Sequence, residues 1–141
     1  MRPPLGAVLL AAAGAAQASP ALTPPAQAHY MLNCMGCHLS DGSGAPGRVP
    51  SLRHSLLPLA LQAAGRRYLV QMPGASQSAL SDEELAAVLN WMVRNLSAQA
   101  VPRGLVPFSA AEVARYRATP LVEVRATRTR LLTAQSATAP R

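Results

Sequence analysis

The sequence predicts a small all-α domain with a C-terminal extension, and three observations support this fold class. Residues 82–96 carry apolar side chains at intervals of three and four behind an acidic first turn, as in an amphipathic helix. Residues 26–34 contain no helix breaker and follow the turn-prone Pro24-Pro25. The one alternating stretch, residues 121–124, is long enough for a single short strand at most.

The N-terminus has the features of an export signal. Met1-Arg2 provides a positive start, residues 5–16 form an apolar run, and Ala16-Gln17-Ala18 matches a small-x-small cleavage site. We therefore assign residues 1–18 to a signal peptide and expect a soluble, exported chain that begins near Ser19. An uncleaved N-terminal anchor is the alternative, although the run is shorter than the roughly 20 apolar residues of a membrane helix.

Beyond the signal, about 120 residues remain, which is enough for one small domain. We place this domain at residues 19–96 and treat residues 97–141 as an extension, because Pro102, Gly104 and Pro107 mark a linker. The chain has one Trp, one Phe and three Tyr. So few aromatic side chains predict a thin core unless a large planar ligand occupies its centre.

The most informative motif is Cys34-Met35-Gly36-Cys37-His38. The pattern Cys-x-x-Cys-His is the spacing of c-type haem attachment. Each thiol can form a thioether with one vinyl group of a porphyrin, and the adjacent imidazole can reach the iron as proximal ligand. The motif therefore predicts one haem c, bound covalently through Cys34 and Cys37 and ligated by His38. Together with the export signal, it predicts a bacterial periplasmic protein.

Other uses of a Cys-x-x-Cys pair fit this sequence less well. A thioredoxin-like redox pair sits between a strand and a helix, and no strand pattern precedes Cys34. A structural zinc site needs about four ligands, and only His29 and His54 remain, at a spacing that matches no usual zinc pattern. A plain disulfide would leave His38 unexplained.

The segments after the motif predict a loop and then a helix. Residues 39–50 are rich in Gly, Ser and Pro, and we expect them to form an irregular loop along one edge of the haem. Residues 59–71 are compatible with a helix that is interrupted at Gly65. Pro73-Gly74 ends this helix, so Met72 is expected at a helix exit.

The clearest helix has a defined start. Ser81 and Glu84 form a capping-box pattern that satisfies otherwise unpaired backbone amides. The apolar stripe of this helix must be buried, and we expect it to cross the helix that carries Tyr30. The stripe consists of Leu85, Val88, Leu89, Met92 and Leu96, with Trp91 on its flank.

The extension begins with a second capped helix. Ser109 with Glu112 predicts a helix that reaches about Arg117. After Pro120 the periodic pattern fades. We expect a short strand at residues 121–124 and then a solvated, flexible basic tail.

The positive charge of the chain comes from arginine alone. There is no lysine, and the arginines after Arg2 outnumber the acidic residues by six. Export and the lack of interleaved aromatic residues argue against nucleic-acid binding. A negatively charged protein partner is the functional interpretation of this excess, and a bias in genome composition is the alternative.

Taken in order, these parts resemble a class I monohaem cytochrome c. The resemblance covers about residues 21–96 and rests on four features: an aromatic helix leading into Cys-x-x-Cys-His, a Gly/Pro loop, a Met-Pro turn, and an acid-capped last helix with Trp91. The extension matches no family pattern. The resemblance implies a small helical fold wrapped around the haem.

The resemblance also implies roles for individual residues. Cys34 and Cys37 would hold the vinyl groups, His38 would be the proximal ligand and Met72 the distal ligand of the iron. The carbonyl of Pro50 would accept a hydrogen bond from the other nitrogen of His38. Side chains that could meet the haem propionates are Arg48, Arg66, Arg67 and Tyr68, with a solvated helix face as the equal alternative for Arg66 and Arg67.

The sequence offers alternatives for the distal ligand. The separation of His38 and Met72 is short for this family, which implies a trimmed loop and a more exposed porphyrin edge. His54 and an open distal position remain alternatives to Met72. Met92 lies on a helix stripe and is expected in the core, while His29 is expected on the surface.

His/Met ligation leaves no open position on the iron and favours the reduced state, so it predicts single-electron transfer and no enzymatic activity. We expect a carrier between a periplasmic dehydrogenase and a terminal acceptor, such as an oxidase or another cytochrome. One alternative is a dedicated cytochrome subunit of a dehydrogenase complex, docked through the extension. Another is a small haem peroxidase or gas-binding protein with an open distal site. We expect no stable membrane span.

Overall fold

The computed structural model describes residues 25–138, and every regular element in this range is a helix, which confirms the all-α prediction. The predicted signal peptide, residues 1–18, lies outside the described residues. None of the described helices is both long and apolar enough to cross a membrane. In chain order the helices are α1 (Ala26–Asn33), α2 (Leu56–Ala60), α3 (Ala63–Gln71), α4 (Pro73–Ser76), α5 (Asp82–Leu96), α6 (Ala110–Arg117) and α7 (Val124–Thr138).

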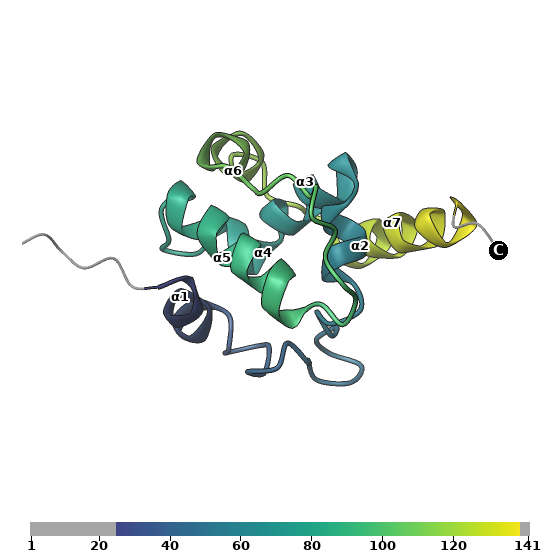
Figure 1. Ribbon diagram of the computed structural model, residues 1–141, viewed down its shortest axis with the longest axis horizontal. Helices are drawn as coiled ribbons and strands as arrows, with labels where there is room; N and C mark the ends of the chain where they lie inside the picture. Colours follow the sequence, from purple (N-terminus) through teal and green to yellow (C-terminus); the bar gives the residue numbers. More distant parts are fainter. Residues whose placement is uncertain (1–24, 139–141) are drawn as a thin grey trace, which may run out of the picture.

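Helix α5 lies at the centre of the molecule, between α1 and α6 (Figure 1). Its capping box is formed as predicted: the Ser81 side chain accepts from the amide of Glu84, and the Glu84 carboxylate accepts from the amide of Ser81. All five residues of the predicted stripe are buried. Helix α1 crosses this helix, and the rings of Tyr30 and Trp91 meet with centroids 5.3 Å apart.

The long segment between α1 and α2 has no helix, as the Gly/Pro pattern predicted. Gly42 has a positive φ of 79° and packs under the side chain of Leu96, which ties the loop to the end of α5. At Gly44 the chain passes so close to itself that a Cβ would lie 2.1 Å from the Val49 carbonyl oxygen. The loop therefore needs glycine at two positions for two different physical reasons.

Helices α2 and α3 correct the prediction for residues 59–71. The break in the helix falls between Ala60 and Ala63, and Gly65 lies inside α3. A Cβ on Gly65 would lie 2.2 Å from the carbonyl oxygen of Leu59. Glycine therefore permits the close approach of α3 to the end of α2 and does not interrupt the helix.

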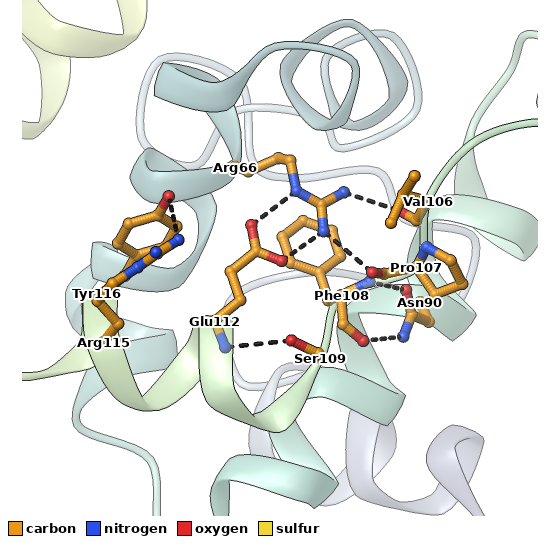
Figure 2. A network of polar contacts seen from close by, with 9 residues as sticks. All are labelled: Arg66, Asn90, Val106, Pro107, Phe108, Ser109, Glu112, Arg115 and Tyr116. Atoms are coloured by element: carbon orange, nitrogen blue, oxygen red, sulfur yellow. Dashed lines mark hydrogen bonds and ion pairs between the residues drawn. The ribbon is translucent and has the colours of Figure 1, made fainter.

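The extension folds back onto the domain through α6, which contacts both α5 and α3 (Figure 1). Figure 2 shows the polar contacts that hold it. The amide side chain of Asn90 donates to the carbonyl of Phe108 at 2.9 Å and accepts from its backbone N–H at 2.7 Å. Phe108 and Val113 are buried, so the first part of the extension completes the core.

The end of the chain differs from the expected strand and flexible tail. Residues from Val124 form helix α7, which contacts α2 and α3 and lies at the opposite end of Figure 1 from α1. Leu131 and Leu132 are half-buried against the core, and Gln135 donates to the carbonyl of Pro58 at 2.9 Å. Tertiary packing of these residues outweighs the weak local pattern.

The Gly65→Ala variant should be less stable than the wild type by about 1–3 kcal/mol, because the new methyl group must displace the backbone at Leu59. Urea unfolding followed by far-UV circular dichroism measures this loss. Gly74→Ala is the matched control, since a Cβ there meets nothing within 4 Å. Equal losses in the two variants would contradict the close approach of α2 and α3.

Candidate haem site

The Cys-x-x-Cys-His motif continues α1 as a hydrogen-bonded turn. The amide of Cys34 donates to the carbonyl of Tyr30 at 2.9 Å, and the amides of Cys37 and His38 both donate to the carbonyl of Cys34, at 3.2 and 3.0 Å. Side chains separated by three and four positions in such a turn lie on the same side. Both cysteines and the histidine therefore share one backbone turn.

The two thiols of this turn are unbonded and differ in exposure. Cys34 is half-buried against the core, while Cys37 is exposed. Burial, with a smaller effect of the neighbouring Cys37, raises the pKa of the Cys34 thiol to about 11. Since a redox-active pair depends on a reactive thiolate, the raised pKa disfavours the thioredoxin-like alternative.

The imidazole of His38 is half-buried, and burial lowers its pKa. The neutral form that this favours is the form that binds a metal. Its Nδ1 is buried and makes no hydrogen bond, so the expected bond to the carbonyl of Pro50 is not formed, and Pro50 itself is exposed. That contact stays a prediction. Two unbonded thiols and an imidazole in one turn fit the covalent attachment of a haem.

Tyr30 fixes the far end of the motif. Its buried hydroxyl donates to the carbonyl of Leu39 at 2.6 Å, and Leu39 directly follows His38. The ring of Tyr30 packs on Trp91 at the same time. One side chain of α1 thus connects the end of the haem motif to α5.

Met72 lies between two helices, at the end of α3 and the start of α4, which confirms the predicted helix exit. Its carbonyl accepts from the amides of Ala75 and Ser76, both at 2.8 Å, and from the Ser76 hydroxyl at 3.1 Å. The side chain is half-buried and packs against the same core as Cys34. A ligand at this position would be held by the backbone on both sides.

The other candidate ligands lie elsewhere. Met92 is buried on α5, as expected of a core residue. His54 is exposed. His29 was expected on the surface, but only 7% of it is exposed, and its Nε2 lies 3.6 Å from a carboxylate oxygen of Glu84. The crossing of α1 over the first turn of α5 buries it.

Arg66 has partners other than the solvent or propionate considered for it. Its guanidinium forms a two-pronged contact with Glu112, donates to the carbonyls of Val106 and Pro107, and stacks 3.9 Å above the ring of Phe108 (Figure 2). Arg66 is therefore an anchor for the extension. The remaining candidates are the buried Tyr68, the exposed Arg48, and Arg67, whose guanidinium lies over the Tyr116 ring.

Sequence reasoning missed the contacts of Arg117. Its guanidinium donates to the carbonyls of Ser76, Ser78 and Leu80, in the loop that follows Met72. The only local signal was an arginine at the end of a predicted helix, which is an ordinary position for a basic residue. Nothing in the sequence indicated that this helix returns to the methionine loop.

Comparison with known proteins agrees with this site. The family model described as "Cytochrome C oxidase, cbb3-type, subunit III" matches residues 21–92. Cytochrome c-552 of Thermus thermophilus is 32% identical over 103 residues, which cover 60% of this chain and 79% of the relative. A second cytochrome c-552 from the same species is also 32% identical over 103 residues, which cover 60% of this chain and 70% of that relative.

The Tyr30→Phe variant should lose about 1 kcal/mol of stability at neutral pH, because the carbonyl of Leu39 loses its hydrogen bond. Burial, as the largest cause, raises the pKa of Tyr30 from 10.0 to about 12. The folded state thus favours the neutral phenol, and the resulting stability is present below about pH 10 and is lost as the pH rises through about 12.

Tyr30→Phe has no phenol at this position to ionise, so it lacks the loss of stability that the wild type shows at high pH. The difference in free energy of unfolding between wild type and variant should therefore narrow as the pH rises. Urea unfolding of both proteins at a series of pH values measures this difference. All other titrating groups are shared, so they cancel in the comparison. A difference that stays constant over this range would contradict the assigned role of Tyr30.

Proposed function

The chain belongs to the cytochrome c family, in the group described as subunit III of cbb3-type cytochrome c oxidase, and on this premise we propose that it is a periplasmic carrier of single electrons. Members of this family transfer electrons through a haem. The finer proposal is that this chain holds one haem c, attached covalently, with His38 and Met72 as the two ligands of the iron.

The observation that carries the proposal is the turn at residues 34–38. It carries two unbonded thiols, of which Cys34 packs against the core, and an imidazole whose pKa is lowered by burial. Cys34 and Cys37 would each form a thioether bond. The haem would then stay attached whatever its non-covalent affinity for the chain. When bound, the haem supplies a one-electron ferric/ferrous couple. The chain's part is to hold the ligands still and to exclude water.

Met72 is the proposed sixth ligand. Its backbone is fixed by the ends of α3 and α4, and its thioether is half-buried against the core. A thioether opposite the imidazole closes the site to small molecules and favours the reduced state. This arrangement supports electron transfer over a peroxidase or gas-binding function.

The partners that we propose are redox proteins of the periplasm. A dehydrogenase would donate the electron, and an oxidase or another cytochrome would accept it. The family name supports an oxidase on the acceptor side. Arg125 and Arg130 on α7 are exposed, which fits a partner with negative surface charge. Export would follow from the signal peptide proposed at residues 1–18.

The fold argues against a subunit that docks through the extension, residues 97–141, as a flexible arm. Phe108 and Val113 in the extension are buried in the core, so residues up to α6 are not available as an independent arm. Within the described part of the extension, α7 offers an exposed basic surface to a partner. A dedicated subunit of a dehydrogenase complex would therefore have to dock through folded surfaces.

Covalent attachment can be tested directly. Wild-type protein matured in a bacterial periplasm should keep its haem stain after denaturing electrophoresis, because thioether bonds survive denaturation. The double variant Cys34→Ala/Cys37→Ala should lose the stain completely. His54→Ala is the control and should stain like the wild type. Loss of the stain from wild-type protein would contradict covalent attachment.

The ligand set can be tested by spectroscopy. Met72→Ala should remove the charge-transfer band of ferric methionine ligation and should let cyanide and carbon monoxide bind rapidly, because the sixth position becomes open. Optical and magnetic circular dichroism spectra in both oxidation states measure these changes. Met92→Leu, a volume-conserving change in the core, should leave the band intact. An unchanged spectrum in Met72→Ala would refute the assignment and favour His54 or an open site.

A further inference from the structure

The loop that follows Met72 is held by a residue from outside the haem domain. Three carbonyls of this loop, those of Ser76, Ser78 and Leu80, accept hydrogen bonds from the guanidinium of Arg117. The same guanidinium lies 3.1 Å from the carboxylate of Asp82, at the start of α5. One side chain thus spans the whole connection from α4 to α5.

A second contact from the extension reaches the other side of Met72. The backbone N–H of Leu121 donates to the carbonyl of Gln71 at 3.1 Å. Gln71 is the last residue of α3 and directly precedes Met72. Arg117 and Leu121 are only four positions apart, and between them they hold the chain before and after the methionine.

The segment that makes these contacts is itself well anchored. Glu112 pairs with Arg66 of α3, and Phe108 exchanges two hydrogen bonds with Asn90 of α5 (Figure 2). The Arg66–Glu112 pair is largely shielded from solvent, with 13% and 15% of the side chains exposed. Because α6 is fixed to two helices of the domain, Arg117 is presented from a rigid base.

We propose that Arg117 and the backbone of Leu121 form a clamp that keeps the Met72 loop, residues 72–81, closed on the haem site. The clamp rests on the proposed function, since it acts through Met72 as an iron ligand. Arg117 and Leu121 are positioning residues. Leu121 contacts the backbone before Met72, Arg117 contacts three loop carbonyls and the carboxylate of Asp82, and the clamp sets how often the loop that carries Met72 opens. The family model ends at residue 92, so these residues lie outside the matched region.

Arginine suits this task better than lysine. Three carbonyls and one carboxylate converge on a single planar group with five N–H donors. A lysine at the same position keeps the charge but offers a single ammonium. Comparing arginine with lysine at position 117 therefore tests whether the planar set of donors or only the positive charge holds the loop.

The test uses ferric holoprotein and imidazole as the probe ligand. Opening of the loop exposes the sixth position, so imidazole should bind more tightly wherever the clamp is weakened. Arg117→Gln should bind imidazole about tenfold more tightly than the wild type, and its methionine charge-transfer band should fade at a lower temperature. Arg117→Lys should fall between the two. Arg115→Gln, which removes a neighbouring exposed arginine, should match the wild type.

A second pair of variants tests the backbone contact. Leu121→Pro removes the N–H donor and should behave like Arg117→Gln. Leu121→Ala keeps the donor and loses only side-chain packing, so it should bind imidazole less tightly than the proline variant. Leu96→Ala removes a buried side chain at the end of α5 opposite the loop, and it should leave imidazole affinity unchanged below its unfolding temperature.

The outcomes separate the clamp from the proposed ligation. One outcome would overturn the clamp and leave Met72 as the iron ligand. In it, the wild type shows the methionine charge-transfer band, and Arg117→Gln and Leu121→Pro bind imidazole no more tightly than the wild type does. An equal gain in affinity for Leu96→Ala would also overturn the clamp, because the effect would then follow global stability. Absence of the methionine band from wild type would overturn both proposals.

Discussion

Burial of the apolar face of α5 is the constraint on which the rest of the molecule depends. Five apolar side chains at helical spacing need partners, and α1, α2 and α6 supply them from three parts of the chain. Each buried Leu or Val contributes roughly 1.5–3 kcal/mol, whereas a typical hydrogen bond contributes about 1 kcal/mol. The hydrophobic stripe therefore decides where the elements lie, and polar contacts decide how individual loops are held.

The sequence could predict what depends on neighbouring residues. The start of α5 followed from Ser81 and Glu84, because a capping box satisfies its own backbone groups. The helix exit at Met72 followed from Pro73, whose ring cannot continue a helix. The role proposed for Cys34, Cys37 and His38 followed from their spacing alone, and the structure adds that they share one hydrogen-bonded turn. Each of these features is settled within about one helical turn.

Features that depend on distant partners could not be predicted in the same way. His29 is buried because α1 crosses the first turn of α5, which no local pattern indicates. Arg66 was expected at a propionate or on a solvated helix face, but its guanidinium binds Glu112 and two carbonyls of the linker. Helix α7 has a weak periodic pattern, and the packing of Leu131 and Leu132 makes it a helix. In each case the choice between structures is made by tertiary contacts.

The two proposed iron ligands are held by different kinds of interaction. His38 lies on a turn that continues α1, and the Tyr30–Trp91 contact joins this turn to the buried face of α5. Met72 lies between two short helices, and polar contacts to loop carbonyls hold its surroundings. Local opening of a loop costs less free energy than unfolding of a packed helix pair. The methionine side is thus the weaker side of the site, and a carrier that must keep both ligands through each redox cycle gains most from contacts added there. Arg117 adds such contacts without disturbing the packed core around α5.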